Sequence, residues 1–170
     1  MMQYDGDLKI PQHYLVTQPV ITNTVGDYLS QAGRQVLATS ETQKFGHVTF
    51  FFNGNRSAAL PGETHHEIPS DRLPFDHAPQ MKARAITQAT IAALAGNDYD
   101  HIRLNLANGD MVGHTGKLDA TIKAVEELDH CVALLEAAVL QHGGILLLTA
   151  DHGNCEEMFQ VNKKTGAHKR

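Results

Sequence analysis

The sequence predicts an α/β fold with a doubly wound, mostly parallel sheet. Helical and strand-like patterns alternate along the chain, which is the order typical of this layered fold. The run from Ile145 to Leu148 is apolar throughout, as expected of a strand that helices cover on both faces. Two polar segments, Asn108 to Gly116 and Thr149 to Asn154, each follow a predicted strand, and ligands of open α/β sheets bind at the carboxyl ends of the strands.

Length and composition narrow the class of protein. A chain of 170 residues fits one domain and is long enough to bury a core. The formal net charge of -5 argues against a nucleic-acid surface, which is normally basic. No apolar stretch approaches the roughly 20 residues of a membrane span, and the first residues lack a signal-peptide pattern. The two cysteines form no Cys-x-x-Cys pair, so the expected compartment is the cytoplasm.

The chain is expected to begin with a linker, a helix and a strand. Residues 1–18 contain glycine and proline without periodicity, which indicates a linker that precedes a domain of residues 19–170. Thr22 and Asn23 can cap a helix that stops at Gly33. A short strand then covers residues 35–39.

The segment after this strand has two possible structures. Ser40 to Gln43 matches a capping box and predicts a helix through Lys44 and His47. Val48 to Phe52 favours a strand by propensity. We favour the helix because of the capping box, and Asn53-Gly54 ends the element whether it is a helix or a strand.

The second half of the chain shows the clearest periodicity. Asn55 to Pro79 predicts an irregular loop, and loops longer than about 12–15 residues tend to be functional or mobile. A helix from Met81 to Ala95 and a strand from Asp100 to Leu106 follow. The longest helix then ends at Gly143-Gly144 and carries an apolar face made of Ile122, Val125, Leu128, Val132, Leu135 and Val139. The apolar run Ile145 to Leu148 is the last predicted strand.

The two polar segments suit a metal site. Asp110 and His114 are four residues apart, so one helical turn places both side chains on the same side. Asp151 and His152 follow the last strand, where a turn allows both to reach one ion. A carboxylate with an imidazole suits Mn²⁺ or Zn²⁺ better than Ca²⁺, which prefers oxygen alone. Such ions can clamp the oxygens of a phosphoryl group, and Lys44 would add a point charge for a phosphate oxygen.

Each of these residues also has a plainer interpretation. An Asp-x-x-x-His pair is common on helix surfaces, and a single lysine is usually solvated. Finding both pairs in one chain, each after a strand, favours the metal site. The remaining histidines considered lie in loops or on helix faces and receive no role: His65, His66, His77, His101, His130 and His142.

Three runs of sequence carry a resemblance: Ser40 to Phe51, Asn108 to Gly116 and Leu148 to Asn154. Together and in this order they resemble cofactor-independent (2,3-bisphosphoglycerate-independent) phosphoglycerate mutases of the alkaline-phosphatase superfamily. The resemblance covers nearly the whole chain and implies an alkaline-phosphatase-like fold. It also implies the family's activity, the interconversion of 3-phosphoglycerate and 2-phosphoglycerate in glycolysis through a phosphoserine enzyme and two Mn²⁺ ions.

The resemblance implies a role for each candidate residue. Asp110 and His114 match ligands of one metal, and Asp151 and His152 match ligands of the other. Lys44 matches the lysine that contacts the phosphoryl group. The implied partner is a small phosphoglycerate substrate, with no nucleic acid and no membrane, in a monomeric and cytoplasmic parent protein.

Several features of the mutase family are not found in this sequence. The family's nucleophilic serine, a further metal-binding aspartate and the transferase domain belong to an amino-terminal segment, and Ser40, Ser57 and Ser70 match no nucleophile motif. We therefore expect the carboxyl-terminal part of the phosphatase domain, an incomplete domain that is inactive by itself. Because missing strands would leave apolar surface uncovered, we also expect it to self-associate.

One further ligand of the family is a histidine followed by serine or threonine. His168 is followed by Lys169, so we interpret it as a solvated tail residue. Two alternatives to the mutase remain. One is another metal-dependent phosphoryl-transfer enzyme of the superfamily, such as a phosphopentomutase or a phosphodiesterase, which the Lys44 run argues against. The other is a metal-binding domain without catalysis.

Overall fold

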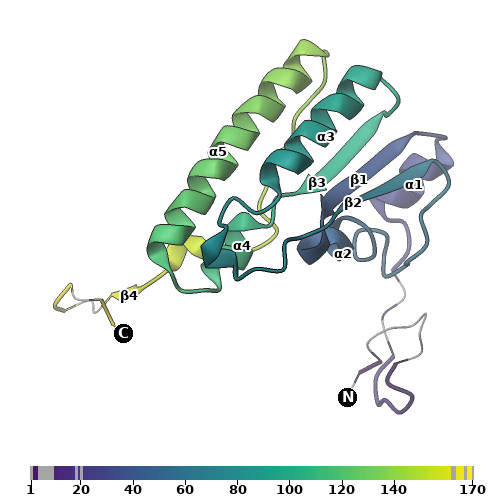
Figure 1. Cartoon of the computed structure of the whole chain (residues 1–170). Coiled ribbons are helices and arrows are strands. Elements are labelled where there is room, and N and C mark those ends of the chain that lie inside the picture. Colours follow the sequence, from purple (N-terminus) through teal and green to yellow (C-terminus); the bar gives the residue numbers. More distant parts are fainter. Residues whose placement is uncertain are drawn as a thin grey trace. The chain divides into compact units, whose positions relative to one another are not determined.

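The computed structural model is an α/β structure of helices and short strands (Figure 1). It describes residues 2–3, 10–17, 19, 21–161, 164–166 and 168–169. The chain forms two compact units, of which the first comprises residues 1–68 and 97–105 and the second comprises residues 69–96 and 106–170. Across the described ranges, no helix has the length and apolarity that crossing a membrane requires.

The first unit contains a parallel sheet of three strands in the order β2-β1-β3. β1 spans Val36–Glu41, β2 spans Glu63–Ile68 and β3 spans His101–Asn105. Each residue of the central strand β1 is buried, including the polar residues at its carboxyl end. The parallel pairing and the helices along the chain confirm the predicted α/β class.

Helix α1 begins one or two residues later than the sequence suggested. It spans Val25–Gln31, and its cap is Thr24 rather than Thr22 or Asn23. The Thr24 hydroxyl accepts a hydrogen bond from the Asp27 backbone N–H at 3.2 Å, and the Asp27 carboxylate accepts one from the Thr24 N–H at 2.9 Å. This reciprocal capping box satisfies two N–H groups that the first helical turn leaves without a partner.

The segment after β1 is helical, as predicted, but the capping box at Ser40 is wrong. Ser40 lies inside β1, and its hydroxyl donates to the carbonyl of Asn105 at 2.9 Å, so it links two strands instead. A 3-10 turn, Thr42–Lys44, and helix α2, Phe45–Val48, follow. Residues 49–53 form turns and not the alternative strand.

The loop predicted from Asn55 to Pro79 is wrong in part, because β2 lies within it. The side chains of β2 alternate, with Glu63 and His65 largely buried and Thr64 and His66 exposed. The inward positions are charged or polar. Hydrophobic periodicity therefore gave no signal for this strand.

The second unit is built on two helices that lie side by side in Figure 1, α3 (Ala83–Gly96) and α5 (Leu118–Gln141). Arg84 of α3 donates to both carboxylate oxygens of Glu127 of α5, at 2.5 and 3.0 Å. Glu127 is buried, and the hydrogen bonds from Arg84 hold its pKa below the usual value. Cys131 of α5 is fully buried.

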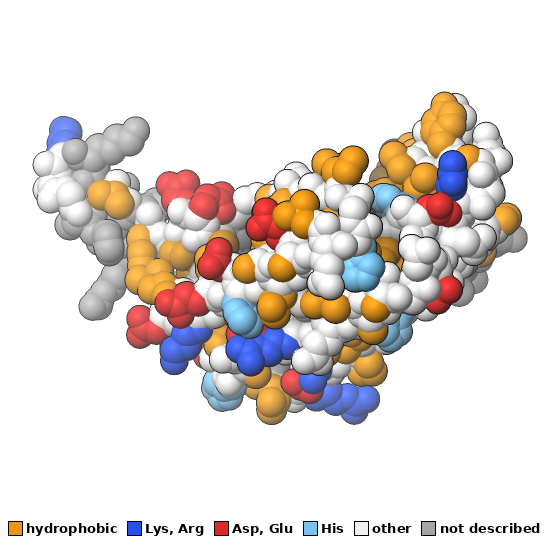
Figure 2. Space-filling model, turned by 90° about the horizontal axis from the view of Figure 1, so that it is seen from above, with side chains coloured by type: hydrophobic (Ala, Val, Ile, Leu, Met, Phe, Trp, Pro, Cys, Tyr) orange, Lys and Arg blue, Asp and Glu red, His pale blue; other side chains and the backbone are white. Residues whose placement is uncertain are grey.

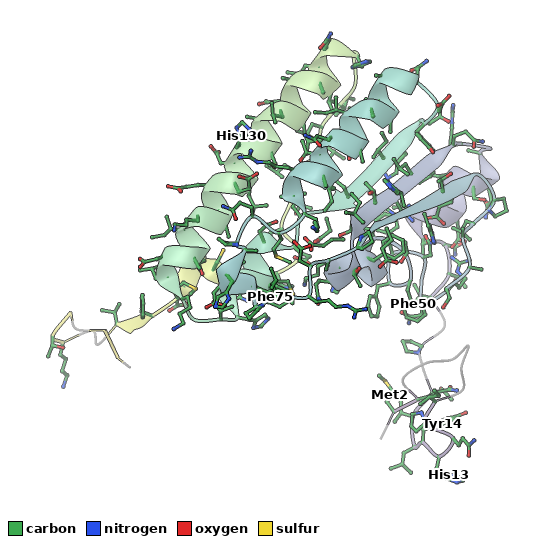
Figure 3. The ribbon with its side chains drawn as sticks, viewed as in Figure 1. Met2, His13, Tyr14, Phe50, Phe75 and His130 are labelled. Atoms are coloured by element: carbon green, nitrogen blue, oxygen red, sulfur yellow. The ribbon has the colours of Figure 1, made fainter. Side chains whose placement is uncertain are left out.

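A short helix precedes α5 and carries the first polar segment. This helix, α4, spans Asn108–Gly113, and Val112 on it is buried against Ala120 and Ala124 of α5. Phe75 packs on this core from the 3-10 turn η2, Phe75–His77 (Figure 3). The remaining elements are the 3-10 turn η3, Cys155–Glu157, and an antiparallel pair, β4 (Gln160–Val161) and β5 (His168–Lys169).

The buried strand predicted at Ile145 to Leu148 is wrong for this chain. Ile145 and Leu147 are 87% and 88% exposed, and among the described residues the segment joins no sheet. A buried parallel strand needs hydrogen-bonded neighbours and a cover on both faces. Ile122 and Val125, predicted on the apolar face of α5, are also exposed. Figure 2 shows hydrophobic side chains (orange) open at the surface of the molecule.

Much of the predicted linker lies outside the described residues, namely positions 1, 4–9 and 18. In the described part, Met2 pairs with Val16, and the Gln3 N–H donates to the Val16 carbonyl at 2.8 Å. Figure 3 labels Met2, His13 and Tyr14 in this part. The boundary between linker and domain at residues 18 and 19 stays a prediction.

Candidate metal centre

The first predicted ligand pair lies at helix α4. Asp110 is in the first turn of α4, and His114 follows the last residue of this helix. One helical turn brings Nε2 of His114 to 3.0 Å from Oδ1 of Asp110. The Asp110 side chain is 14% exposed, whereas that of His114 is 69% exposed. The pair therefore has a carboxylate partly enclosed by protein and an imidazole open to solvent.

The second predicted pair approaches the same carboxylate. Nε2 of His152 lies 3.7 Å from Oδ2 of Asp110 and 3.8 Å from Oδ2 of Asp151. Asp151 and His152 occupy bends in an exposed segment instead of the end of a buried strand. The structure thus gathers four predicted residues into one group within the second unit, which we call the ligand cluster: Asp110, His114, Asp151 and His152.

Asn154 belongs to this site although the sequence assigned it no role. Its side-chain amide donates to Oδ1 of Asp110 at 2.7 Å and to the backbone carbonyl of Asp110 at 3.1 Å. Its own backbone N–H donates to the Glu156 carboxylate at 2.5 Å. The sequence marked Asn154 only as the last residue of the second polar segment, because a contact across 44 positions leaves no local pattern.

The donor set of the ligand cluster fits hard or borderline divalent ions. Carboxylate and imidazole ligands suit Mn²⁺ and Zn²⁺. Two ligand atoms about 2.1 Å from a common octahedral ion lie about 3 Å apart, which is close to the separation of His114 and Asp110. Among the described residues, however, no three His, Cys, Asp or Glu side chains are arranged to hold one ion. The cluster therefore offers ligand pairs, and each pair requires further ligands to complete a metal site.

Lys44, the predicted phosphate-binding residue, belongs to the first unit and not to the unit that holds the ligand cluster. It ends the 3-10 turn Thr42–Lys44, and its side chain is only 5% exposed. A lysine is almost never this buried without a partner, because removing an ammonium group from water is costly. The burial argues against the interpretation of Lys44 as a solvated surface lysine.

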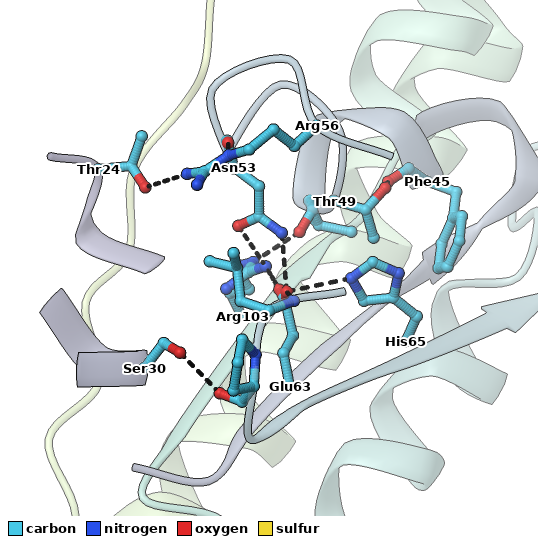
Figure 4. Close-up of polar contacts among 12 residues, drawn as sticks. Thr24, Ser30, Phe45, Thr49, Asn53, Arg56, Glu63, His65 and Arg103 are labelled. Atoms are coloured by element: carbon cyan, nitrogen blue, oxygen red, sulfur yellow. Dashed lines mark hydrogen bonds and ion pairs between the residues drawn. The ribbon is translucent and has the colours of Figure 1, made fainter. Parts of the chain in front are cut away.

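A second polar group in the first unit was not predicted. Arg103 of β3 donates to the Glu63 carboxylate, and Asn53 donates from its amide to the same carboxylate at 2.7 Å (Figure 4). Nε2 of His65 lies 3.4 Å from Oε2 of Glu63. We call Arg103, Glu63, Asn53 and His65 the arginine cluster. Its inward-facing acid and base lie on different strands, 40 positions apart, so spacing along the sequence does not reveal it.

The arginine cluster also holds the turns that follow α2. Nε of Arg103 donates to the carbonyl of Val48, the last residue of α2, at 2.5 Å. The guanidinium lies 4.2 Å from the centre of the Phe52 ring, within the range of a cation–π contact. Burial lowers the pKa of Arg103 to about 10, so this side chain is still charged at neutral pH.

The imidazole of His168, which we interpreted as a solvated tail residue, lies outside the described side chains. The interpretation stays a prediction. Of the other histidines without an assigned role, His65 contacts Glu63.

Comparison with known proteins identifies relatives of the whole chain. A probable 2,3-bisphosphoglycerate-independent phosphoglycerate mutase of Leptospira interrogans is 50% identical over 171 residues, which cover 99% of this chain and 31% of that protein. The 2,3-bisphosphoglycerate-independent phosphoglycerate mutase of Trypanosoma brucei brucei is 52% identical over 96% of this chain and 30% of that protein. The chain thus spans about a third of the length of these relatives.

A solved structure gives the same correspondence in three dimensions. A phosphoglycerate mutase of Leishmania mexicana, crystallised at low cobalt concentration, superposes with a TM-score of 0.94 and 49% sequence identity. The match covers 100% of this chain and 31% of that chain. A family model of the metalloenzyme superfamily matches residues 6–169. The chain therefore belongs to the metalloenzyme superfamily, and it is similar along nearly its whole length to one part of the 2,3-bisphosphoglycerate-independent phosphoglycerate mutases.

Proposed function

We propose that this chain is the carboxyl-terminal part of the metal-binding phosphatase domain of a cofactor-independent phosphoglycerate mutase. The protein would interconvert 3-phosphoglycerate and 2-phosphoglycerate in glycolysis, in the cytoplasm. The observation that carries the proposal is that His114 and His152 both approach the carboxylate of Asp110, with Asp151 beside His152. The relatives named as such mutases support the choice of reaction.

The proposed roles follow from the chemistry of each side chain. Asp110 and His114 hold one Mn²⁺ ion, and Asp151 and His152 hold a second. When bound, two such ions clamp the oxygens of a phosphoryl group and lower the pKa of a nucleophilic hydroxyl. Lys44 binds a phosphoryl oxygen as a point charge, which suits a compact ammonium group.

The proposal assigns the nucleophile to a part of the protein outside these 170 residues. Covalent phosphoryl transfer requires an activated nucleophile, and Ser40, Ser57 and Ser70 match no nucleophile motif. Residues 19–170 would therefore supply metal ligands and a phosphate contact, while catalysis requires the remainder of the mutase. The 170-residue chain by itself is expected to have no mutase activity.

The test is a mutase assay on the product of the complete gene, without added bisphosphoglycerate. We expect activity to vanish with a chelator and to return with Mn²⁺. Replacing a ligand removes transition-state stabilisation of several kcal/mol, so Asp110→Ala and Asp151→Ala should each lower kcat/KM by about a hundredfold to ten-thousandfold.

The matched control is Gln141→Ala, which removes an exposed side chain at the end of α5 and should leave kcat/KM unchanged. Mutase activity that persists under chelation, or in Asp110→Ala, would contradict the proposal. Metal-dependent hydrolysis of other phosphate esters without mutase activity would favour another phosphoryl-transfer enzyme of the superfamily instead.

A further inference from the structure

Asn154 makes two hydrogen bonds to a single proposed metal ligand. The amide Nδ2 donates to the carboxylate of Asp110 at 2.7 Å and to the backbone carbonyl of the same residue at 3.1 Å. One bond restrains the side chain of Asp110, and the other restrains its main chain. The side-chain torsions of Asp110 connect its main chain to its carboxylate. Because Asn154 holds both of these groups, the two hydrogen bonds together select one orientation of the carboxylate.

The position of Asn154 is itself fixed by its surroundings. Its backbone N–H donates to Glu156, and its carbonyl accepts from the Glu157 N–H at 3.3 Å, so the residue is held at the start of the turn η3. Its amide group also lies against helix α4 at Gly113. A Cβ atom at position 113 would lie only 3.0 Å from Oδ1 of Asn154, a distance tighter than ordinary packing allows. Glycine at this position therefore makes room for the amide.

Asn154 joins the two ligand segments of the cluster. It follows His152 by two positions, whereas Asp110 belongs to α4, so the two hydrogen bonds connect the segment of the second ligand pair to the first. The donor is also uncharged. A lysine or arginine at this point would neutralise Asp110 and compete with a cation, but an amide orients the carboxylate and leaves its negative charge in place.

We propose that Asn154 is a positioning residue for the metal centre, which holds Asp110 in the orientation that binds the ion. Groups that hydrogen-bond to a ligating carboxylate typically change metal affinity by about 10- to 100-fold when they are removed. The inference rests on the metal centre of the proposed function and not on the identity of the substrate.

The experiment measures Mn²⁺ binding to the product of the complete gene after the metals have been stripped. Calorimetry gives the affinity of each site, and electron paramagnetic resonance reports free Mn²⁺. Asn154→Leu keeps much of the volume of the side chain and removes its donors. We expect it to weaken one of the two binding steps by about 10- to 100-fold, with the other step much less affected. A role confined to folding would not weaken one site selectively.

A second variant guards against misfolding. Gly113→Ala keeps Asn154, and alanine favours helical backbone over glycine at this last residue of α4. The added Cβ should displace the amide and weaken the same binding step, by less than Asn154→Leu does. Gln141→Ala, which also removes a carboxamide from an exposed position in the second unit, serves as the control and should bind Mn²⁺ as the wild type does.

The outcomes separate the two proposals. If the wild type binds Mn²⁺ and both Asn154→Leu and Gly113→Ala bind it with unchanged affinity, the role of Asn154 is wrong and the metal centre stands. If the wild type binds no Mn²⁺, the metal centre and the role of Asn154 are both wrong. If Asn154→Leu does not fold, the affinity of Gly113→Ala decides.

Discussion

The arginine cluster and the ligand cluster are both polar, but they differ in burial and in the balance of their charges. Arg103 and Glu63 are 7% and 3% exposed, and the guanidinium and the carboxylate neutralise each other. In the ligand cluster, His114 is mostly exposed and His152 is nearly half exposed. That cluster combines two carboxylates with two imidazoles, all of which can donate electron pairs to a cation.

The difference indicates what each cluster contributes. A buried acid and base that satisfy one another maintain the arrangement of the strands and turns around them, and removing one partner leaves an uncompensated charge. A group of acceptors that is open to solvent on its histidine side adds less to stability, because water screens the charges. Such a group can contribute binding free energy when a cation binds to it. We therefore expect the arginine cluster to contribute to the stability of the fold and the ligand cluster to contribute to metal affinity.

The largest expected effect on stability is that of Glu63→Ala. This variant leaves the buried guanidinium of Arg103 without its carboxylate, and breaking a buried pair in this way costs about 3–5 kcal/mol. Hydrogen exchange of the β1 amides in the product of the complete gene measures the local loss of unfolding free energy. The matched control is Glu67→Ala in the same strand, which removes an exposed acceptor of the Thr42 hydroxyl and should cost about 1 kcal/mol or less. Equal losses in the two variants would remove the distinction between the clusters.

The same comparison explains how far the sequence predicted the fold. β1 and β3 were found because their pattern is apolar or alternating, and α5 because its apolar residues recur at helical spacing. β2 was missed because its inward residues, Glu63 and His65, are polar and have their partners in a distant strand. The run at Ile145 to Leu148 was assigned to a sheet on composition alone. Composition does not specify the neighbouring strand to which such a run must hydrogen-bond.

For the candidate site too, the sequence indicated residues that are close along the chain and missed a residue whose contact is distant along the chain. The ligand cluster could be proposed because Asp110 and His114 share a helical turn, and because Asp151 and His152 follow an apolar run. Asn154 could not be assigned, since its function depends on two hydrogen bonds across the fold. Short-range spacing thus indicates which residues can bind an ion, while the residues that orient them emerge only from the packed structure.

The next prediction concerns the acid stability of the arginine cluster. Burial lowers the pKa of His65 below its usual value, so the imidazole contacts Glu63 in its neutral form at pH 7. The unfolded chain then binds a proton more readily than the folded chain as the pH falls below about 6.5. The stability of the first unit should therefore be constant above this pH and decrease below it.

Two variants identify the responsible group. His65→Gln should make the decrease shallower, as measured by hydrogen exchange of β1 between pH 7.5 and about 5. His101 contributes in the same direction, since burial lowers its pKa as well, so the double variant should be shallower still. His66→Gln, at an exposed position of the same strand, is the control and should leave the pH profile as it is. A profile that is unchanged in His65→Gln would show that other groups cause the acid sensitivity.

The smallest expected change in stability is that of His114→Ala, at the exposed edge of the ligand cluster. An exposed imidazole–carboxylate contact contributes about 0–1 kcal/mol, so the melting temperature of the metal-free protein should hardly change. Added Mn²⁺ should reveal the difference, because an ion that binds only the folded state at 100 times its Kd stabilises it by about 2.7 kcal/mol. The wild type should gain this stability, and His114→Ala should gain clearly less at the same Mn²⁺ concentration. A loss in the metal-free protein as large as that of Glu63→Ala would mean that the ligand cluster is a structural element, and the contrast between the two clusters would fail.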